Sequence, residues 1–423
     1  MQFGIFYEHQ IPRPWDERDE HKLFQDAIEQ VELADGLGID YAWEVEHHFL
    51  EEYSHSSAPE VFLAACSQRT QRIRLGHGIV LMPPAYNHPA RVAERIATLD
   101  IVSNGRVEWG TGESSSRIEL EGFGVHPDQK RDMWEEAVRE TARMMDSSPY
   151  PGFEGKYFSM PHRNVVPKPV QKPHPPIWVA CSNRETIKMA ARMGIGALTF
   201  AFVDAEEASH WVDEYYTTFK NECEPIGRAV NPNIAMVTGF MCHEDSDTAV
   251  QRGLQGFQFF GYGLQHYYGT GTHLPGEFNI WDDFVKNGPK QQGPTGCIGN
   301  PEQVRKTLEI YESAGVDQVV FIQQGGNNKH EHIKESLELF SETVLPEFKA
   351  RHDASSQRKT EELAPYVEAA NQRIPPIEPI SPNPPVDSYP VMMEKLGIPQ
   401  DPAQRRSSIL ALLGAEPDPG DDD

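Results

Sequence analysis

The sequence lacks any surplus of positive charge. Its 423 residues carry a formal net charge of −26, and the sequence pI is about 5.0. A chain this acidic is repelled by the phosphate backbone of a nucleic acid. We therefore expect no nucleic-acid partner, although locally organised hydrogen-bond donors can still hold a small anion.

Cysteine is scarce, and long apolar runs are missing. The five cysteines, at positions 66, 181, 223, 242 and 297, form no CxxC pair and no metal-binding spacing. Such usage is typical of reduced thiols in the cytoplasm. The N-terminus MQFGIFYEHQ has no basic region, and no run reaches the roughly 18 apolar residues of a membrane span. The sequence predicts a soluble cytoplasmic protein that contacts no membrane.

Strand-like and helix-like segments alternate along most of the chain. The eight strand-like runs are residues 3–7, 39–43, 73–81, 106–110, 176–180, 196–202, 233–242 and 317–323. Helical patterns separate them, as in residues 21–38, where an apolar face ends at glycines. This alternation predicts an α/β fold with a parallel sheet, and eight units predict a (β/α)8 TIM barrel. An open doubly wound sheet is the alternative.

Three segments interrupt the alternation. Residues 146–175 are rich in proline and form an irregular excursion before the fifth strand. Residues 256–299 are rich in glycine and aromatic residues, and a loop of that length is typical of a lid. The barrel is predicted to cover residues 1–349, and residues 350–423 contain a polyproline-type stretch and an acidic end. We expect this last part to be an extended arm that either wraps a neighbour or is disordered.

Residues 43–49, WEVEHHF, place two adjacent histidines among acids at the end of the second predicted strand. In a (β/α)8 barrel, catalytic residues come from the carboxyl ends of the strands. An isolated pair of histidines is more often a pair of hydrogen-bonded core imidazoles. The position at a strand end and the neighbouring acids favour a functional site instead.

Residues 182–187, SNRETI, begin a helix directly after the fifth predicted strand. Ser182 or Asn183 can cap this helix, so that its free N–H groups and the positive end of its dipole face the barrel mouth. Such a site suits a phosphate, and an ordinary capped helix is an equally good interpretation. No strand–GxGxxG–helix unit of the dinucleotide type lies near the N-terminus.

Together these segments resemble the bacterial luciferase-like flavin monooxygenases, most closely the luciferase α-type chain. The likeness runs from MQFGIF to about residue 349 and rests on GIDYAWEVEHHF, IVLMPPAYNHPARVAERIATLDIVSNGRVEWG, PIWVACSNRETIKMAARMG and WDDFVKNGPK. It implies a barrel that binds reduced FMN, supplied by a separate flavin reductase. The flavin would react with O2 to give a C4a-peroxide that oxygenates a small organic substrate by Baeyer–Villiger insertion, hydroxylation or epoxidation.

The resemblance also implies roles for individual residues. His47 falls on the catalytic histidine, a general base or proton donor; His48 falls on its neighbour, and Glu119 on the acid partnered to it. A carboxylate beside an imidazole raises its pKa and orients it. The other implied positions are the phosphate contacts Ser182, Asn183 and Thr186, the lid lysine Lys290, and a non-proline cis peptide between Gly78 and Ile79.

The chain departs from the α-type pattern at two adjacent positions. Glu113 stands where that chain has a phosphate-binding arginine, and Gly112 stands where it has a cysteine. A second acid near a phosphate is unfavourable, so we expect either that Arg184 or Arg117 supplies the missing charge or that the phosphate site is displaced. Oxidation of long-chain aldehydes and light emission are therefore not carried over.

Two other functions stay open at this point. Related barrels transfer a hydride with a deazaflavin, which forms no C4a-peroxide, and Glu113 would also suit a non-catalytic flavin-binding subunit. For the substrate we expect a mostly apolar molecule, because aromatic side chains are predicted at the barrel mouth. These are Phe6, Trp43, Phe200, Phe202, Phe259, Phe260, Tyr262 and Trp281.

The resemblance further implies a homodimer. Luciferase-like barrels pair through the helices that follow the early strands, which here are residues 59–70 and 88–104. An isologous patch would need apolar side chains on the outer faces of these helices. The candidates are Val61, Phe62, Val92 and Ile96, and the alternative for each is that it faces the barrel wall.

Overall fold

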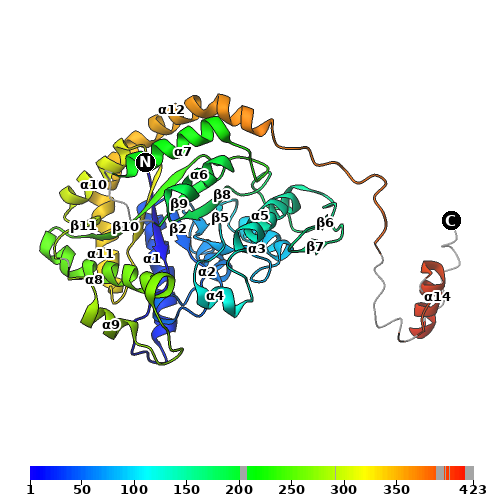
Figure 1. Cartoon of the computed structure of the whole chain (residues 1–423), viewed down its shortest axis with the longest axis horizontal. Helices are drawn as coiled ribbons and strands as arrows, with labels where there is room; N and C mark the ends of the chain where they lie inside the picture. The colour runs from blue at the N-terminus through cyan, green and yellow to red at the C-terminus, as the bar shows by residue number, and fades with distance from the viewer. Residues whose placement is uncertain (201–206, 291, 387–394, 396, 400, 415–423) are drawn as a thin grey trace. The chain divides into compact units, whose positions relative to one another are not determined.

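A closed barrel of eight parallel strands forms the body of the protein (Figure 1). The computed structural model describes residues 1–200, 207–290, 292–386, 395, 397–399 and 401–414. The barrel strands are β1 Gln2–Tyr7, β2 Tyr41–Glu44, β3 Arg74–His77, β5 Val107–Gly112, β8 Ile177–Cys181, β9 Gly196–Thr199, β10 Ile234–Cys242 and β12 Gln318–Ile322. Each pairs in parallel with the next, and β12 pairs with β1, so the sheet closes on itself. The predicted (β/α)8 barrel is confirmed.

Helices surround the barrel, as the alternation predicted. They are α1 Asp19–Leu37, α2 Pro59–Ser67, α3 Pro89–Val102, α5 Lys130–Asp146, α6 Arg184–Arg192, α7 Ala208–Glu222, α8 Ser246–Gln265, α10 Pro301–Ser313 and α11 His330–Thr343. Proline at the first position starts α2, α3 and α10, where its missing N–H has no helical partner to lose. Gly38 ends α1 with a left-handed φ of 89°, which a residue with a side chain rarely adopts.

The interior of the barrel is filled by aromatic side chains. Trp43 and Trp178 meet edge to face with their ring centroids 5.4 Å apart, and both are buried. A Cβ atom at Gly76 would lie 2.3 Å from the ring of Trp43, so only glycine fits opposite it. The barrel is therefore a packed core, and a ligand can bind only at one of its ends.

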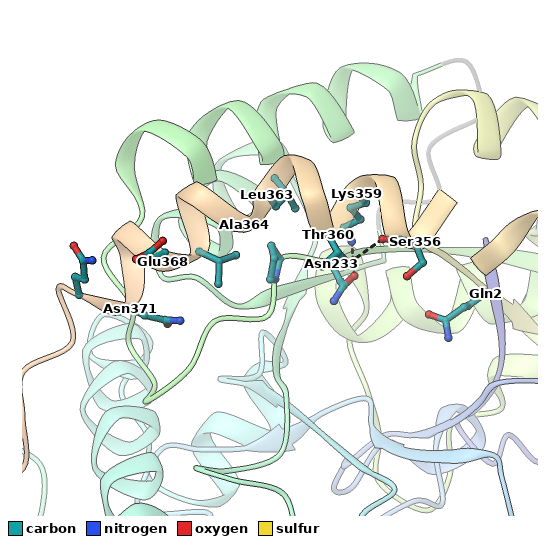
Figure 2. A pocket seen from close by; sticks show the side chains of 12 residues that line it. Gln2, Asn233, Ser356, Lys359, Thr360, Leu363, Ala364, Glu368 and Asn371 are labelled. Carbon is teal, nitrogen blue, oxygen red and sulfur yellow. Dashed lines mark hydrogen bonds between the residues drawn. The ribbon is translucent and has the colours of Figure 1, made fainter. Parts of the chain in front are cut away.

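The end of the barrel at which the strands begin is covered by α12 Leu345–Asn371. Leu363 and Ala370 of this helix are buried, and Lys359 binds Asp317 and Asn233, which lie directly before β12 and β10 (Figure 2). The groove along α12 in Figure 2 is lined mainly by polar side chains of the helix. In Figure 1, α12 and the pair α8 and α9 Ile280–Asn287 lie on opposite sides of the barrel.

Two predicted boundaries differ from the structure. Residues 350–371 continue the helix α12, and the first compact unit ends at Ile377 rather than at residue 349. This stretch is rich in good helix formers and has an apolar face to bury, which outweighs its single internal proline. The second unit, Glu378–Asp423, contains α14 Pro402–Leu412. The predicted lid begins later than residue 256, because residues up to Gln265 belong to α8.

The patch predicted for dimer formation is wrong for three of its four residues. Phe62, Val92 and Ile96 are buried against the barrel, while Val61 is 66% exposed. The homodimer itself stays a prediction. Within the described part of the chain, no helix combines the length and the hydrophobicity that a membrane crossing requires.

The unit boundary predicts how two truncated chains behave. A chain that ends at residue 377 should keep the free energy of unfolding of the full chain, because it retains every contact of α12. A chain that ends at residue 349 loses the buried Leu363 and the ion pair of Lys359, so its free energy of unfolding should fall by roughly 3 kcal/mol or more. Urea unfolding checks both, with Leu363→Ala in the full chain as a milder control. Equal stability of the two truncated chains would contradict the assignment.

Candidate active site

His47 lies directly after β2, at the end of the barrel opposite to α12. Its Nδ1 atom lies 3.0 Å from Oε1 of Glu119, which belongs to α4 Arg117–Gly122, and its Nε2 atom lies 3.6 Å from Oε2 of Glu8. Burial alone would lower the pKa of His47, but the carboxylates of Glu119 and Glu8 outweigh it and raise this pKa to about 9. The imidazole is therefore positively charged at neutral pH.

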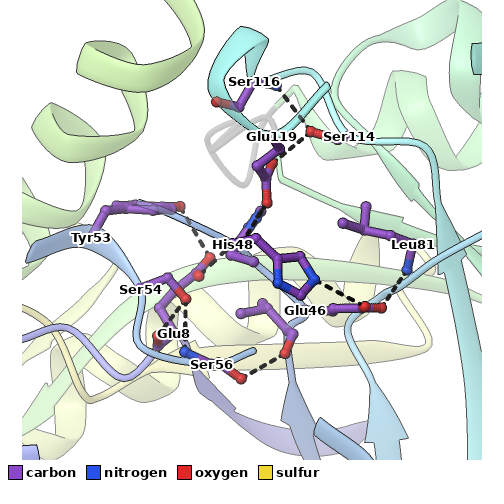
Figure 3. A network of polar contacts seen from close by, with 12 residues as sticks. Glu8, Glu46, His48, Tyr53, Ser54, Ser56, Leu81, Ser114, Ser116 and Glu119 are labelled. Carbon is purple, nitrogen blue, oxygen red and sulfur yellow. Dashed lines mark hydrogen bonds and ion pairs between the residues drawn. The ribbon is translucent and has the colours of Figure 1, made fainter. Parts of the chain in front are cut away.

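Glu119 is the acid that holds this charge. Burial alone would raise its pKa, but His47 and hydrogen bonds from the Ser114 hydroxyl and the His48 backbone N–H lower it (Figure 3). Ser114 has a positive φ of 61°, and this conformation accompanies a 2.6 Å bond from its hydroxyl to Glu119. Strained backbone of this kind is common at functional sites. Glu119 itself is fully buried behind the histidine and does not line the cavity described below.

Glu8 is the second carboxyl at the histidine, and it comes directly after β1. Its Oε1 atom accepts a 3.0 Å hydrogen bond from the Tyr53 hydroxyl, and its Oε2 atom has no hydrogen-bond partner. Burial raises the pKa of Glu8 to about 7, although the charge of His47 acts against this. At neutral pH this group can thus both donate and accept a proton.

His48, predicted as a second catalytic residue, points away from the cavity. Its Nε2 atom lies 3.1 Å from Glu46, whose carboxylate also accepts hydrogen bonds from the Leu81 backbone and the Asn87 side chain (Figure 3). Its ring packs on the aromatic ring of Phe123. The alternative of a hydrogen-bonded imidazole therefore holds for this one of the two histidines, and its role is to fix the loop.

A cavity of about 400 Å³ opens beside His47. One end is mainly apolar, and its walls are Val45, Tyr53, Phe200, Leu264 and Tyr268, together with the polar groups Glu8 and His47. The other end carries the polar residues Glu113, Ser115, Arg131, Ser182 and Thr186, whereas Ser114, whose hydroxyl binds Glu119, lies on the side of His47. Between the two ends lie Gly78, Ile79, Leu81, Gly112, Trp134, Val179, Ala180 and Cys181. The volume and mixed walls are those of a small-molecule site.

The middle of the cavity has a flat apolar wall because of a glycine. A Cβ atom at Gly112 would lie 2.5 Å from Cδ1 of Ile79, so any side chain there would displace Ile79. The short strand β4 Val80–Leu81 pairs with the end of β5 and holds this segment in place. Every cis peptide bond in the described residues precedes a proline, so the cis bond expected between Gly78 and Ile79 is wrong.

The polar end of the cavity obtains its positive charge from α5. Arg131 binds Glu113 through two hydrogen bonds of 2.8 and 2.7 Å, and Lys130 lies 3.3 Å from the same carboxylate. The two arginines expected to supply this charge do not. Arg184 forms an exposed ion pair with Glu214, and Arg117 is exposed beside Glu121. Neither arginine lines the cavity.

The start of α6 completes the polar end. Asn183 caps the helix by accepting a 3.0 Å hydrogen bond from the Thr186 N–H, and the Thr186 hydroxyl is the second half of this capping box. Ser182 and Thr186 line the cavity, whereas Asn183 is exposed and has its side chain engaged in the cap. Of the predicted phosphate contacts, the structure therefore brings two to the cavity.

A short π-helix, η2 His266–Thr270, closes the apolar end. Its Tyr268 hydroxyl lies 3.5 Å from Nδ1 of His47. The segment that follows is held by η1 Glu51–Tyr53: Glu51 accepts hydrogen bonds from His273 and Gly276, and Glu52 accepts them from the N–H groups of Ile280 and Trp281. The loop that carries the histidine thus also holds the lid.

Several residues predicted to line the site lie elsewhere. Phe6 and Trp43 are packed inside the barrel, and Phe259 and Phe260 are buried on α8. Trp281 packs against Phe259, and Lys290 is exposed with its ammonium group on the carbonyl of Val285. Tyr262 donates to Asp283. Phe200 does line the cavity, and Phe202 lies outside the described residues.

Among the residues of the cavity wall that sequence reasoning missed are Glu8, Tyr53, Arg131 and Tyr268. Glu8 and Tyr53 follow strand ends, so the rule that singled out His47 would also have found Glu8 in FGIFYEH. Arg131 is the second residue of α5 and has no motif around it, and Tyr268 lies in the long segment predicted only to be a lid. Their roles depend on distances across the fold that no local pattern records.

The chain is similar in sequence and in fold to several known proteins. The chain is 33% identical to the uncharacterized protein y4wF of Sinorhizobium fredii. The match covers 41% of this chain and 49%, about half, of that protein. It is 27% identical over 364 residues to the oxygenase component of the flavin-dependent trigonelline monooxygenase of Acinetobacter baylyi, covering 82% of this chain and 96% of that one. The crystal structure of monooxygenase RslO1 from Streptomyces bottropensis superposes with a TM-score of 0.67 at 25% identity, over 82% of this chain and all of that one.

The sequence model of the luciferase-like monooxygenases matches residues 1–318, three quarters of the chain. The chain therefore belongs to the luciferase-like monooxygenase family.

Proposed function

We propose that this protein is a monooxygenase that uses reduced FMN and O2 to oxygenate a small organic substrate. The observation that carries the proposal is the charged His47, paired with Glu119, at one end of a cavity whose other end holds a positive charge and a capped helix. The similarity to the oxygenase component of a two-component enzyme supports a separate flavin reductase as partner.

The residues present fit FMN. The hydroxyls of Ser182 and Thr186, the first N–H groups of α6 and the guanidinium of Arg131 form a donor set suited to a phosphate. The wall formed by Ile79 and Gly112 suits one face of a flat ring system. When bound, reduced FMN supplies the two electrons for the activation of O2.

The chain's own groups then handle charge and protons. The imidazolium of His47 donates from Nε2 into the cavity, so it can stabilise negative charge that develops there or supply a proton. Glu119 keeps the imidazole charged and fixes its orientation through Nδ1. Tyr268 and Leu264 close the apolar end and exclude water from it.

A second candidate is hydride transfer with the deazaflavin F420. The chain is 24% identical over 341 residues to an F420-dependent glucose-6-phosphate dehydrogenase of Amycolatopsis mediterranei. Such an enzyme needs no O2, so a requirement for O2 separates the two candidates.

The first test uses the protein under anaerobic conditions. FMNH2 should bind, and mixing with O2 should give an absorbing species that differs from reduced and oxidised FMN and persists for seconds. His47→Ala should bind FMNH2 with unchanged affinity but lose this species, because the charge that stabilises it is gone. Stopped-flow absorbance measures both. The exposed His126→Ala is the control, and a persistent species in His47→Ala would disprove the assigned role.

The second test concerns the phosphate end. Arg131→Met should weaken FMN binding about tenfold or more, because a charged hydrogen bond to the phosphate is lost. Glu113→Gln should strengthen binding severalfold, because it removes a competing carboxylate and frees Arg131. Equilibrium titration measures these affinities, with riboflavin, which lacks the phosphate, as the matched ligand. Arg184→Met is the control variant, and equal effects on FMN and riboflavin would place the phosphate elsewhere.

The third test uses the pH dependence of stability. The pKa of His47 is raised from 6.5 to about 9 on folding, so its protonation stabilises the fold fully below pH 6.5, and this contribution is lost as the pH rises through 9. The free energy of unfolding should therefore fall by about 3 kcal/mol more in the wild type than in His47→Gln between these values. Urea unfolding at pH 6 and 9.5 measures the difference. Parallel curves for the two proteins would show that the imidazole is not charged.

A further inference from the structure

Glu8 carries an unsatisfied oxygen in the wall of the cavity. The residue is 2% exposed, and only Oε1 has a hydrogen-bond partner, the hydroxyl of Tyr53. Buried polar atoms are almost always hydrogen-bonded, because losing water without replacement is costly. The Oε2 atom lies 3.6 Å from Nε2 of His47, which is too long for a hydrogen bond. Because both residues line the cavity, a bound molecule can satisfy both atoms.

The chemistry of this pair selects the group that binds between them. Nε2 of His47 is a donor, since Nδ1 faces Glu119 and the imidazole is charged. The ionised Oε2 atom of Glu8 is an acceptor. A hydroxyl oxygen can accept from the first atom and donate to the second, whereas an ether or a carbonyl cannot donate and a carboxylate is repelled by the acids around it.

Resting on the proposed monooxygenase function, we propose that Glu8 is a substrate-binding acid–base group and that the site takes an apolar molecule bearing a hydroxyl on an sp2 carbon, a phenol or an enol. The hydroxyl lies between Glu8 and His47, and the apolar body lies against Val45, Phe200 and Leu264. In the proton transfer, the O–H bond of the substrate breaks and its electron pair stays on the substrate oxygen. The proton goes to Oε2 of Glu8, and Nε2 of His47 donates to the resulting anion.

The acidity of the groups explains why the carbon must be sp2. Glu8 has a pKa of about 7, raised by burial, and a phenol has a pKa of about 10, close enough for transfer when an imidazolium stabilises the anion. An aliphatic alcohol is far too weak an acid. The titratable groups that face Glu8 from the surrounding elements are His47, Tyr53, Glu119, Tyr268 and Glu44. Binding should rise with pH as Glu8 ionises near 7 and fall as His47 loses its proton near 9.

The probe is 2-naphthol, whose absorption shifts to longer wavelength when its hydroxyl donates its proton. It is titrated into the flavin-free protein and, separately, into the protein with FMN, and 2-methoxynaphthalene serves as the matched ligand without a donor. The wild type should bind 2-naphthol at least tenfold more tightly than the methyl ether at pH 8, and the bound naphthol should show the long-wavelength shift. Glu8→Gln should lose both the preference and the shift. Glu140→Gln, a buried acid outside the cavity, should keep both.

Equal affinity of the wild type for the two ligands would overturn the proposal. This comparison uses the wild type alone, so it does not depend on whether a variant folds. A preference and shift that persist in Glu8→Gln would also overturn it. Circular dichroism and the FMN affinity of each variant establish that the fold and the phosphate end are intact. Failure of the monooxygenase function would instead appear as absent FMN binding, which is measured separately from the response to naphthol.

Discussion

The ion pair between the imidazolium of His47 and the carboxylate of Glu119 organises the mouth of the barrel. It joins the loop after β2 to α4, and it fixes the direction in which Nε2 points. Glu119 gains a serine hydroxyl and a backbone N–H in addition, so the negative charge is fully compensated and the pair tolerates its burial. Glu8 has a single donor, so its burial is less compensated, and burial raises its pKa to about 7. His47 thus lies between two carboxyl groups in different environments. Glu119 stays ionised, and Glu8 can exchange a proton.

The cavity divides its tasks between two halves of the sheet. The loops after β1 and β2 contribute the groups that hold and move protons, while β5, α5 and α6 contribute the polar end. Among the described residues that line the cavity, Glu113 is the acid at that end, and its contact with Arg131 means that an anionic ligand must compete with a carboxylate for the guanidinium. For a phosphate bound there, as proposed, the affinity would depend on the balance of these charges.

Much of the fold could be predicted because the signals for it are local. Each of the eight barrel strands overlaps an apolar run found in the sequence, and prolines mark where three of the helices begin. His47 and Ser182 could be found because strand ends are the functional positions of such barrels. Arg131 could not be found in this way, because its place at the cavity depends on a contact with Glu113, which lies 18 residues earlier in the chain. His48 does not line the cavity, and the sequence could not show this, because the loop points the side chains of two adjacent residues in different directions. Residues 350–423 were predicted to be an extended arm because of their prolines. The helix-forming residues that precede these prolines instead continue α12 to Asn371.

Glu51 and Glu52 connect the lid segment to the loop that carries His47. Glu51 and Glu52 hold the lid segment through four hydrogen bonds, and they stand only a few positions after His47 in the same loop. A ligand that leaves through the lid must loosen these bonds and so disturbs the loop that positions the imidazole. Movement of the lid segment and displacement of the histidine loop are then coupled, because the same four hydrogen bonds join the two segments.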